Sequence, residues 1–367
     1  SYHEETETLS IHRFWQIIIK SQRTLEKQEA DLIIVLEILG KIGVGIKQGQ
    51  TSLEEREGWR LHMKIFEEER ERILRNYRPM QVLHPSIALS LNEVGLGCHA
   101  LGELRKAFLY YEKALEMRKK LYGSQPHFDL VTSLNNVGSI HRALGKGQEA
   151  LLYYKNALKM CKDLYKDQPH PALIQTLNSV GVGYVALGKA EEGLLYYEEA
   201  LTMCAKLYKD QPHHPNLALS LSNIGGAYGA LGKRKESFEC FQKALEIRKV
   251  LYNNQPHPSL ALSLNNMGKA CNNLKAYSIL GNYNLGVNYC KQAFQMGYEV
   301  YGQAHPHLIL YLHKTINALN KVNDPSVIKT TQEELYPLCV KTLGENHEQT
   351  QLLMKIKKQP RFLPSFL

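Results

Sequence analysis

The sequence has 367 residues, 44% of them hydrophobic and 22% charged, and a formal net charge of +9 at pH 7. Its longest apolar run, residues 32–46, is interrupted by Glu37 and Lys41 and is too short to span a bilayer, so we expect a soluble protein without a membrane partner. Seven cysteines at scattered positions give no disulfide framework, which favours a reducing, cytoplasmic setting.

Residues 1–26 predict a helix that is either an N-terminal cap or the end of a truncated upstream domain, because the sequence begins at Ser1 and not at Met. Its segment LSIHRFWQ resembles the end of the winged-helix segment in NB-ARC-type signalling ATPases, with Phe14 and Trp15 in place of the usual Leu and Val. Residues 27–83 then predict a degenerate helix pair, as expected for a terminal unit of a repeat array.

A repeated stretch follows, headed by His84, His127, His170, His214 and His257. The copies lie 43 or 44 residues apart, and a Leu-Gly pair stands 17 residues beyond each of the first four histidines. Self-similarity with such a period is typical of a solenoid of stacked units. We therefore predict five regular repeats in residues 84–304.

Each repeat predicts two helices. The proline after most of the histidines suits the first helical position, and the glycine of the Leu-Gly pair suits a left-handed cap at the end of the first helix. The second helix of the first copy is predicted from Glu103 to Tyr122, where Tyr111 and Leu115 lie on its apolar stripe.

The spacing of small and large residues within a copy carries a family resemblance. The marker positions of the second copy are Leu134, Gly138, Leu144, Gly145, Ala150, Tyr154 and Ala157. This pattern resembles the tetratricopeptide repeat, in the long variety found in kinesin light chains and related proteins, over residues 84–302. The resemblance implies an all-α fold, a right-handed α-solenoid (superhelix) of stacked antiparallel helix pairs.

The fifth repeat holds six extra residues between its helices, in the segment AYSILG at residues 276–281. We interpret them either as drift in a surface loop or as a hydrophobic lip made by Tyr277, Ile279 and Leu280. Residues 305–346 predict a degenerate sixth repeat, whose second helix contains Pro337 and should kink there. Residues 347–367 predict a C-terminal capping helix and tail.

In the tetratricopeptide family the first helices line the concave surface, and the resemblance carries this role to particular positions. The polar residues predicted to bind a peptide or partner are Asn92, Glu93, Asn135, Asn136, Arg142, Asn178, Asn223, Asn265, Asn266, Lys269 and Asn272. The remaining positions of this set hold Leu96, His99, Ser139, Ser179, Val182, Val185, Ser222, Gly226 and Gly229. An asparagine offers a donor and an acceptor, so a ladder of them suits the backbone of an extended peptide. The alternative interpretation is that some asparagines pin neighbouring helices.

Two other motifs are rejected. The stretch from Gly183 to Lys189 fits a phosphate loop, but Ala190 stands where a hydroxyl must hold magnesium, and its glycines are repeat markers. Histidines one repeat apart cannot share a metal ion, because packed helices lie about 8–10 Å apart and a zinc–nitrogen bond is about 2 Å. We therefore predict no cofactor, no metal site and no catalytic site.

The positive charge lies in residues 84–367, mostly on the second helices, in stretches such as EKALEMRKK and KALEIRKV. We expect these basic residues to face solvent. A nucleic-acid track is disfavoured, because no aromatic platform is interleaved with the charges.

The sequence thus predicts a non-catalytic protein–protein interaction scaffold that binds a peptide segment or partner protein in a concave groove. We expect it to be the sensor or docking module of a larger intracellular signalling protein. A cargo adaptor similar to kinesin light chains, a regulatory solenoid for an enzyme whose catalytic domain lies elsewhere, and a self-associating structural protein are the alternatives. An intramolecular contact with missing N-terminal domains also stays open.

Overall fold

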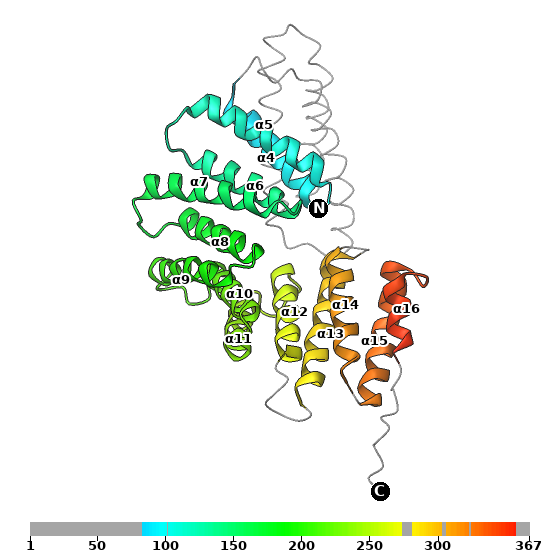
Figure 1. Cartoon of the computed structure of the whole chain (residues 1–367). Helices are drawn as coiled ribbons and strands as arrows, with labels where there is room; N and C mark the ends of the chain where they lie inside the picture. Colours follow the sequence, from blue (N-terminus) through cyan, green and yellow to red (C-terminus); the bar gives the residue numbers. More distant parts are fainter. Residues whose placement is uncertain (1–82, 101, 274–280, 303–305, 323, 357–367) are drawn as a thin grey trace, which may run out of the picture. The chain divides into compact units, whose positions relative to one another are not determined.

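The computed structural model describes residues 83–100, 102–273, 281–302, 306–322 and 324–356 (Figure 1). These residues form thirteen helices and contain no strand, which confirms the predicted all-α class. The predicted helix at residues 1–26, the helix pair at 27–83, the lip at Tyr277, Ile279 and Leu280, and the tail lie outside the described residues. The right-handed course of the array stays a prediction.

The chain divides into two compact units, residues 1–167 and residues 168–367. The described part of the first unit holds two helix pairs, in which the second helix of the first pair also packs on the first helix of the next. Its helices are α4 (Pro85–Ala100), α5 (Leu104–Tyr122), α6 (Phe128–Ala143) and α7 (Gly147–Tyr165).

Within the second unit the same order of packing is seen, because the second helix of each regular pair packs on the first helix that follows it. Its regular pairs are α8 (Pro171–Ala186) with α9 (Ala190–Leu207), α10 (Pro215–Ala230) with α11 (Arg234–Leu251), and α12 (Pro258–Asn273) with α13 (Gly281–Tyr301). Next along the chain come α14 (Pro306–Leu319), α15 (Pro325–Leu343), which continues through Pro337, and α16 (Glu348–Lys355).

The repeated histidines are the caps at the starts of the first helices. The Nδ1 atom of His127 accepts a hydrogen bond of 3.2 Å from the backbone N–H of Asp129. The same bond recurs at His84, His170, His214, His257 and His347, with lengths of 3.1–3.2 Å. Because the first N–H groups of a helix have no partner within it, each ring satisfies one of them.

A tyrosine at the end of the preceding helix stacks on three of these rings. The ring centroids of Tyr208 and His214 are 3.4 Å apart, and those of Tyr252 and His257 are 3.6 Å apart. Tyr122 stacks on His127 in the same way. The stack fixes the plane of the imidazole and thereby the direction of Nδ1.

The first helices end as predicted at the Leu-Gly pairs. Gly145 has a φ of +77°, and its N–H bonds to Arg142 O at 3.0 Å. The next N–H, of Lys146, bonds to His141 O at 2.9 Å. These two bonds form a Schellman motif, which only a left-handed residue allows, and the turn reverses the chain into the second helix.

A glycine within the first helix of each regular pair lets the two helices approach closely. A Cβ atom added at Gly138 would lie 2.6 Å from Cε1 of Tyr154, and one added at Gly95 would lie 2.7 Å from Cδ1 of Tyr111. The aromatic ring therefore rests directly on the backbone of the first helix. Tyr154 and Tyr111 are buried in consequence.

Two basic residues do not face solvent, and the expectation that these stretches point outward is wrong for them. Arg118, in EKALEMRKK, is 2% exposed, and Arg248, in KALEIRKV, is 5% exposed. Each lies on the face of a second helix that packs on the next repeat. Arg118 donates to Ser133 Oγ at 2.7 Å and to Asp129 O at 3.0 Å.

We predict that Gly138→Ala lowers the free energy of unfolding by about 1–3 kcal/mol, because the new methyl group overlaps the buried ring of Tyr154. The matched control is Gly226→Ala, where an added Cβ meets no atom within 4 Å. The control should stabilise by about 0.5–1 kcal/mol through helix propensity. Urea unfolding followed by circular dichroism measures both, and equal effects would contradict the close contact.

We predict that the protein loses stability on mild acidification and that His214→Asn reduces this loss. Burial lowers the pKa of His214 below its usual value of 6.5. The stability from its neutral form is therefore complete above the unfolded pKa and is lost as the pH falls through the folded pKa. Asparagine keeps a cap acceptor but does not titrate. Urea unfolding at pH 8 and pH 5 tests this, and an unchanged pH dependence in the variant would contradict it.

Candidate functional site

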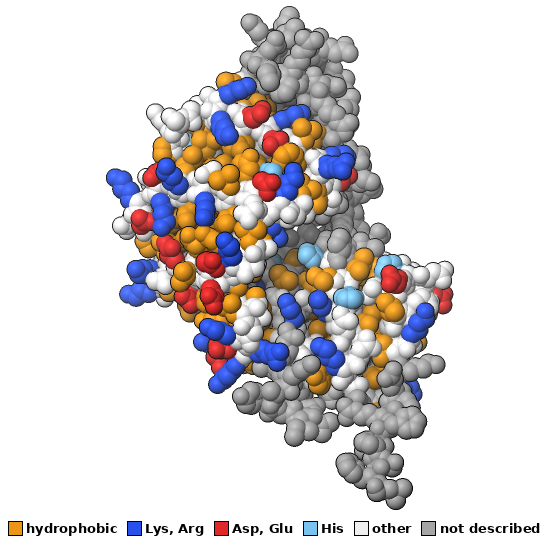
Figure 2. Space-filling view, viewed as in Figure 1, with side chains coloured by type: hydrophobic (Ala, Val, Ile, Leu, Met, Phe, Trp, Pro, Cys, Tyr) orange, Lys and Arg blue, Asp and Glu red, His pale blue; other side chains and the backbone are white. Residues whose placement is uncertain are grey.

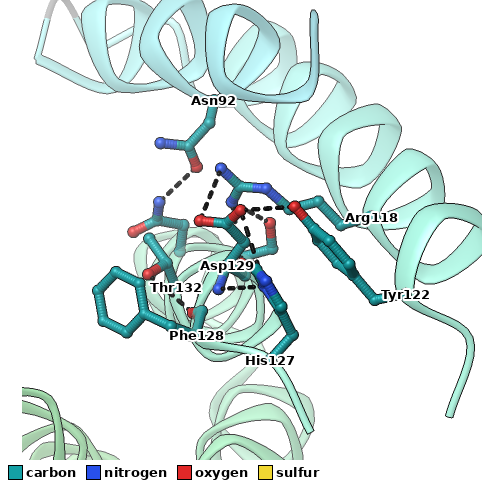
Figure 3. Close-up of polar contacts among 9 residues, drawn as sticks. Asn92, Arg118, Tyr122, His127, Phe128, Asp129 and Thr132 are labelled. Atoms are coloured by element: carbon teal, nitrogen blue, oxygen red, sulfur yellow. Dashed lines mark hydrogen bonds and ion pairs between the residues drawn. The ribbon is translucent and has the colours of Figure 1, made fainter. Parts of the chain in front are cut away.

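The asparagines of the first helices fall into buried and half-buried sets. Asn92 and Asn178 are each 5% exposed, and each accepts a hydrogen bond from the asparagine of the following repeat. Asn136 Nδ2 donates to Asn92 Oδ1 at 2.6 Å (Figure 3), and Asn223 Nδ2 donates to Asn178 Oδ1 at 2.9 Å. These amide pairs bridge successive first helices within a unit, and they define the register between repeats.

The half-buried members of these pairs keep part of their hydrogen-bonding capacity. Within the described residues, neither Asn136 nor Asn223 makes a hydrogen bond through Oδ1. Asn266 is also half-buried and makes no hydrogen bond to another described residue. These three positions therefore retain amide groups that can pair with a ligand. We call the surface formed by the first helices of one unit the first-helix face of that unit.

The buried asparagines either form hydrogen bonds within the protein or are enclosed by it. Asn178 Nδ2 donates to Ile174 O at 3.0 Å and to Ser220 Oγ at 3.3 Å. Asn265 and Asn272 are buried, and their Oδ1 atoms have no hydrogen-bond partner in the described part of the chain. Of the other predicted residues, Glu93 and Asn135 are half-buried, and Arg142 and Lys269 are exposed.

A row of leucines that the sequence analysis did not identify runs beside these amides in the second unit. Leu219, Leu262 and Leu310 are 41%, 40% and 39% exposed. Each stands five residues after a repeat histidine, and that regular spacing was the available signal. Leu219 and Leu262 precede Asn223 and Asn266 by four residues, so leucine and asparagine share one face of each helix.

The buried arginine of the first unit is charge-compensated. Figure 3 shows Arg118 and Tyr122 of α5 pointing toward Asp129 at the start of α6. Arg118 Nη2 is 3.9 Å from Asp129 Oδ1, and Tyr122 OH donates to Asp129 Oδ2 at 2.8 Å. Burial lowers the pKa of Arg118, and the carboxylate of Asp129 opposes that shift.

The buried arginine of the second unit has no such compensation. Arg248 Nη1 donates to Ser222 Oγ at 2.9 Å and also to Ser263 Oγ, and no carboxylate of the described residues forms an ion pair with it. Burial lowers the pKa of this guanidinium. The position that holds Asp129 in the second repeat holds Ser259 in the fifth.

The described residues contain no group of three or more His, Cys, Asp and Glu side chains placed to hold a metal ion. Over the same residues, no helix combines the length and apolar character that a membrane crossing requires.

Paired helices with histidine caps, Schellman turns and glycine–aromatic contacts define a helical repeat protein. Sequence profiles described as tetratricopeptide repeat match residues 87–129, and residues 129–206 and 184–249. Residues 87–249 are therefore similar to tetratricopeptide repeats. No curated protein sequence matches it.

Three solved structures match parts of this chain. NprR in complex with its cognate peptide NprX has 16% identity, covers 92% of this chain and 88% of its own, and gives a TM-score of 0.55. The match to putative kinesin light chain repeats of Podosopora anserina has 20% identity and covers 60% of this chain and 99% of the other, with a TM-score of 0.46. The match to BtubC (BKLC) of P. vanneervenii has 21% identity and covers 65% of this chain and 89% of the other, with a TM-score of 0.48.

We predict that Asn223→Ala and Asn266→Ala differ in their effect on stability. Loss of the Asn223 amide leaves Asn178 Oδ1 without that donor in a buried position, which should cost about 1–3 kcal/mol. Asn266 makes no internal hydrogen bond in the described part of the chain, so its loss should cost about 0.5 kcal/mol or less. Thermal and urea unfolding compare the two variants. An equal and large cost for Asn266→Ala would show that it is structural.

Proposed function

We propose that the chain is a non-catalytic scaffold that binds an extended peptide segment of a partner protein on the first-helix face. The observation that supports this most directly is the half-buried asparagines of the first helices, Asn136 in the first unit and Asn223 and Asn266 in the second. Two of these amides are oriented by a bond to the preceding repeat, while their oxygen stays unbonded within the described residues. A fixed amide costs little further entropy when it pairs with a ligand.

The chemistry of this face suits a peptide backbone with apolar side chains. An amide accepts from a backbone N–H through its oxygen and donates to a backbone C=O through its nitrogen, whatever side chains the ligand carries. The exposed leucines Leu219, Leu262 and Leu310 add apolar contacts one turn away from the amides of the second unit. The ligand would thus be recognised by main-chain bonds together with a few apolar side chains.

We infer that the scaffold is the sensor or docking module of a larger cytoplasmic signalling protein. All seven cysteines are free thiols, as a reducing compartment favours. NprR, whose fold is similar, was solved with its cognate peptide.

Photo-crosslinking tests the proposed surface. Leu262 of the full chain is replaced with p-benzoylphenylalanine, the variant is irradiated in cell extract, and the adducts are identified by mass spectrometry. The matched control carries the same group at Val250, which is also exposed but lies on the second helix α11. We expect adducts to defined peptide segments at Leu262 and not at Val250, and fewer of them when Asn266→Ala is added. Identical adducts at both positions would refute the proposal.

A further inference from the structure

The first helices of the second unit carry charge of one sign only. α8, α10, α12 and α14 contain no Asp or Glu, and their lysines are Lys269 and Lys314. The second helices α9, α11, α13 and α15 all contain glutamates. Figure 2 shows acidic and basic side chains mixed over much of the visible surface, so a layer without acids is a local departure.

The lysines of this layer lack the partners that a second-helix lysine has. Lys291 Nζ of α13 is 2.8 Å from Glu334 Oε2 of α15. Lys269 is exposed and Lys314 half-buried, and neither forms an ion pair with a carboxylate of the described residues. Their positive charge is therefore available to an anion from outside.

The buried guanidinium of Arg248, which has no carboxylate partner among the described residues, is a second and independent observation that favours an anionic ligand. A buried charge is costly unless it is paired, and Arg118 of the first repeat has Asp129 for this purpose. Arg248 has only serine hydroxyls, and one of them belongs to Ser222 on the first-helix face. The uncompensated guanidinium therefore lies directly beneath that face.

The register between repeats locates where an anion would sit. Asn92 meets Asn136 and Asn178 meets Asn223, so the same register sets Ser222 opposite Asn266. One turn further along these helices come Gly226 on α10 and Lys269 on α12. A Cβ added at Gly226 meets nothing within 4 Å, so this position is open. We call it the Gly226 site.

We propose that the first-helix face of the second unit binds an acidic extended peptide, with one of its Asp or Glu carboxylates in the Gly226 site. Lys269 Nζ and the free amide of Asn266 bind the carboxylate, and Arg248 supplies countercharge from below. The inference rests on the proposed peptide-binding function and adds the charge of the ligand. A nucleic acid fits less well, because the exposed side chains beside the site are leucines and not stacking platforms.

The spacing of the repeats indicates how such a peptide is arranged. An asparagine–asparagine bond limits neighbouring first helices to about 10 Å, close to the distance between packed helices. A polyproline II chain advances about 9 Å in three residues and then presents the same side. Each repeat would therefore contact about three residues of the peptide. One apolar side chain of the peptide would pack on a leucine such as Leu262, and an acidic side chain would lie beside it.

The test measures binding of a fluorescein-labelled peptide, in which the triplet Leu-Glu-Ser is repeated four times, to the full chain by anisotropy. We expect binding that weakens as salt rises. Lys269→Glu should weaken it by about tenfold or more, because an attraction becomes a repulsion. The matched control Lys249→Glu, an exposed lysine on the second helix α11, should change the affinity less than about twofold.

A second variant tests the role of Arg248 without removing it. Ser259→Asp places a carboxylate where the second repeat has Asp129, in the first turn of α12, where a negative charge is favourable. The variant should be at least as stable as the parent and should bind the acidic peptide several-fold more weakly. Unchanged affinity in Ser259→Asp together with unchanged affinity in Lys269→Glu would overturn the proposal.

The remaining outcomes separate this inference from the proposed function. A peptide with Lys in place of Glu is a second probe, and an oligouridylate of about twelve nucleotides is a third. If the Lys peptide binds as tightly as the Glu peptide, the acidic ligand is wrong while peptide capture stands. If the oligouridylate binds more tightly and Lys269→Glu abolishes that binding, the ligand is a nucleic acid. If no probe binds although Leu262 crosslinks specifically, the carboxylate site alone is refuted.

Discussion

The contact between a glycine of the first helix and an aromatic ring of the second sets the geometry of every regular pair in which it occurs. Tyr154 on Gly138 and Tyr111 on Gly95 bring the two backbones of a pair together, and Phe241 does the same at Gly225. Only then do the first helices of successive repeats come close enough for their amides to bond. The face that we propose for a ligand thus depends on residues that lie beneath it.

Much of this architecture follows from local sequence signals. The Leu-Gly turn at Gly145 and the helix start at His127 are set by backbone conformation and end-group hydrogen bonds, which depend on neighbouring residues only. The repeat length then places every copy. Such features can be predicted without knowing what packs against them.

The candidate site was harder to predict, because its properties depend on contacts between repeats. The burial of Arg118 and Arg248 could not be inferred from a count of charges, since one face of a basic helix must still pack on its neighbour. The asparagines look alike in the sequence, yet Asn178 is enclosed and Asn266 is half-buried, because they lie at different positions of the repeat, eight and nine residues after its histidine. The leucine row had a visible period but no polar chemistry to single it out.

The contact between one repeat and the next differs along the second unit. After the third repeat, Cys204 Sγ lies 3.8 Å from Ser220 Oγ. After the fourth, Arg248 Nη1 donates to Ser263 Oγ. After the fifth, a Cβ added at Gly297 would lie 3.1 Å from Cδ2 of Tyr311. Loss of the fourth repeat by recombination would bring Cys204 against Ser263 and preserve the chemistry of the junction. Loss of the fifth would set Arg248 against Tyr311, a buried cation against a ring without its serine acceptor. The fourth repeat could therefore be lost without an unfavourable contact at the new junction, whereas the fifth could not. The number of repeats can change in evolution at some boundaries only.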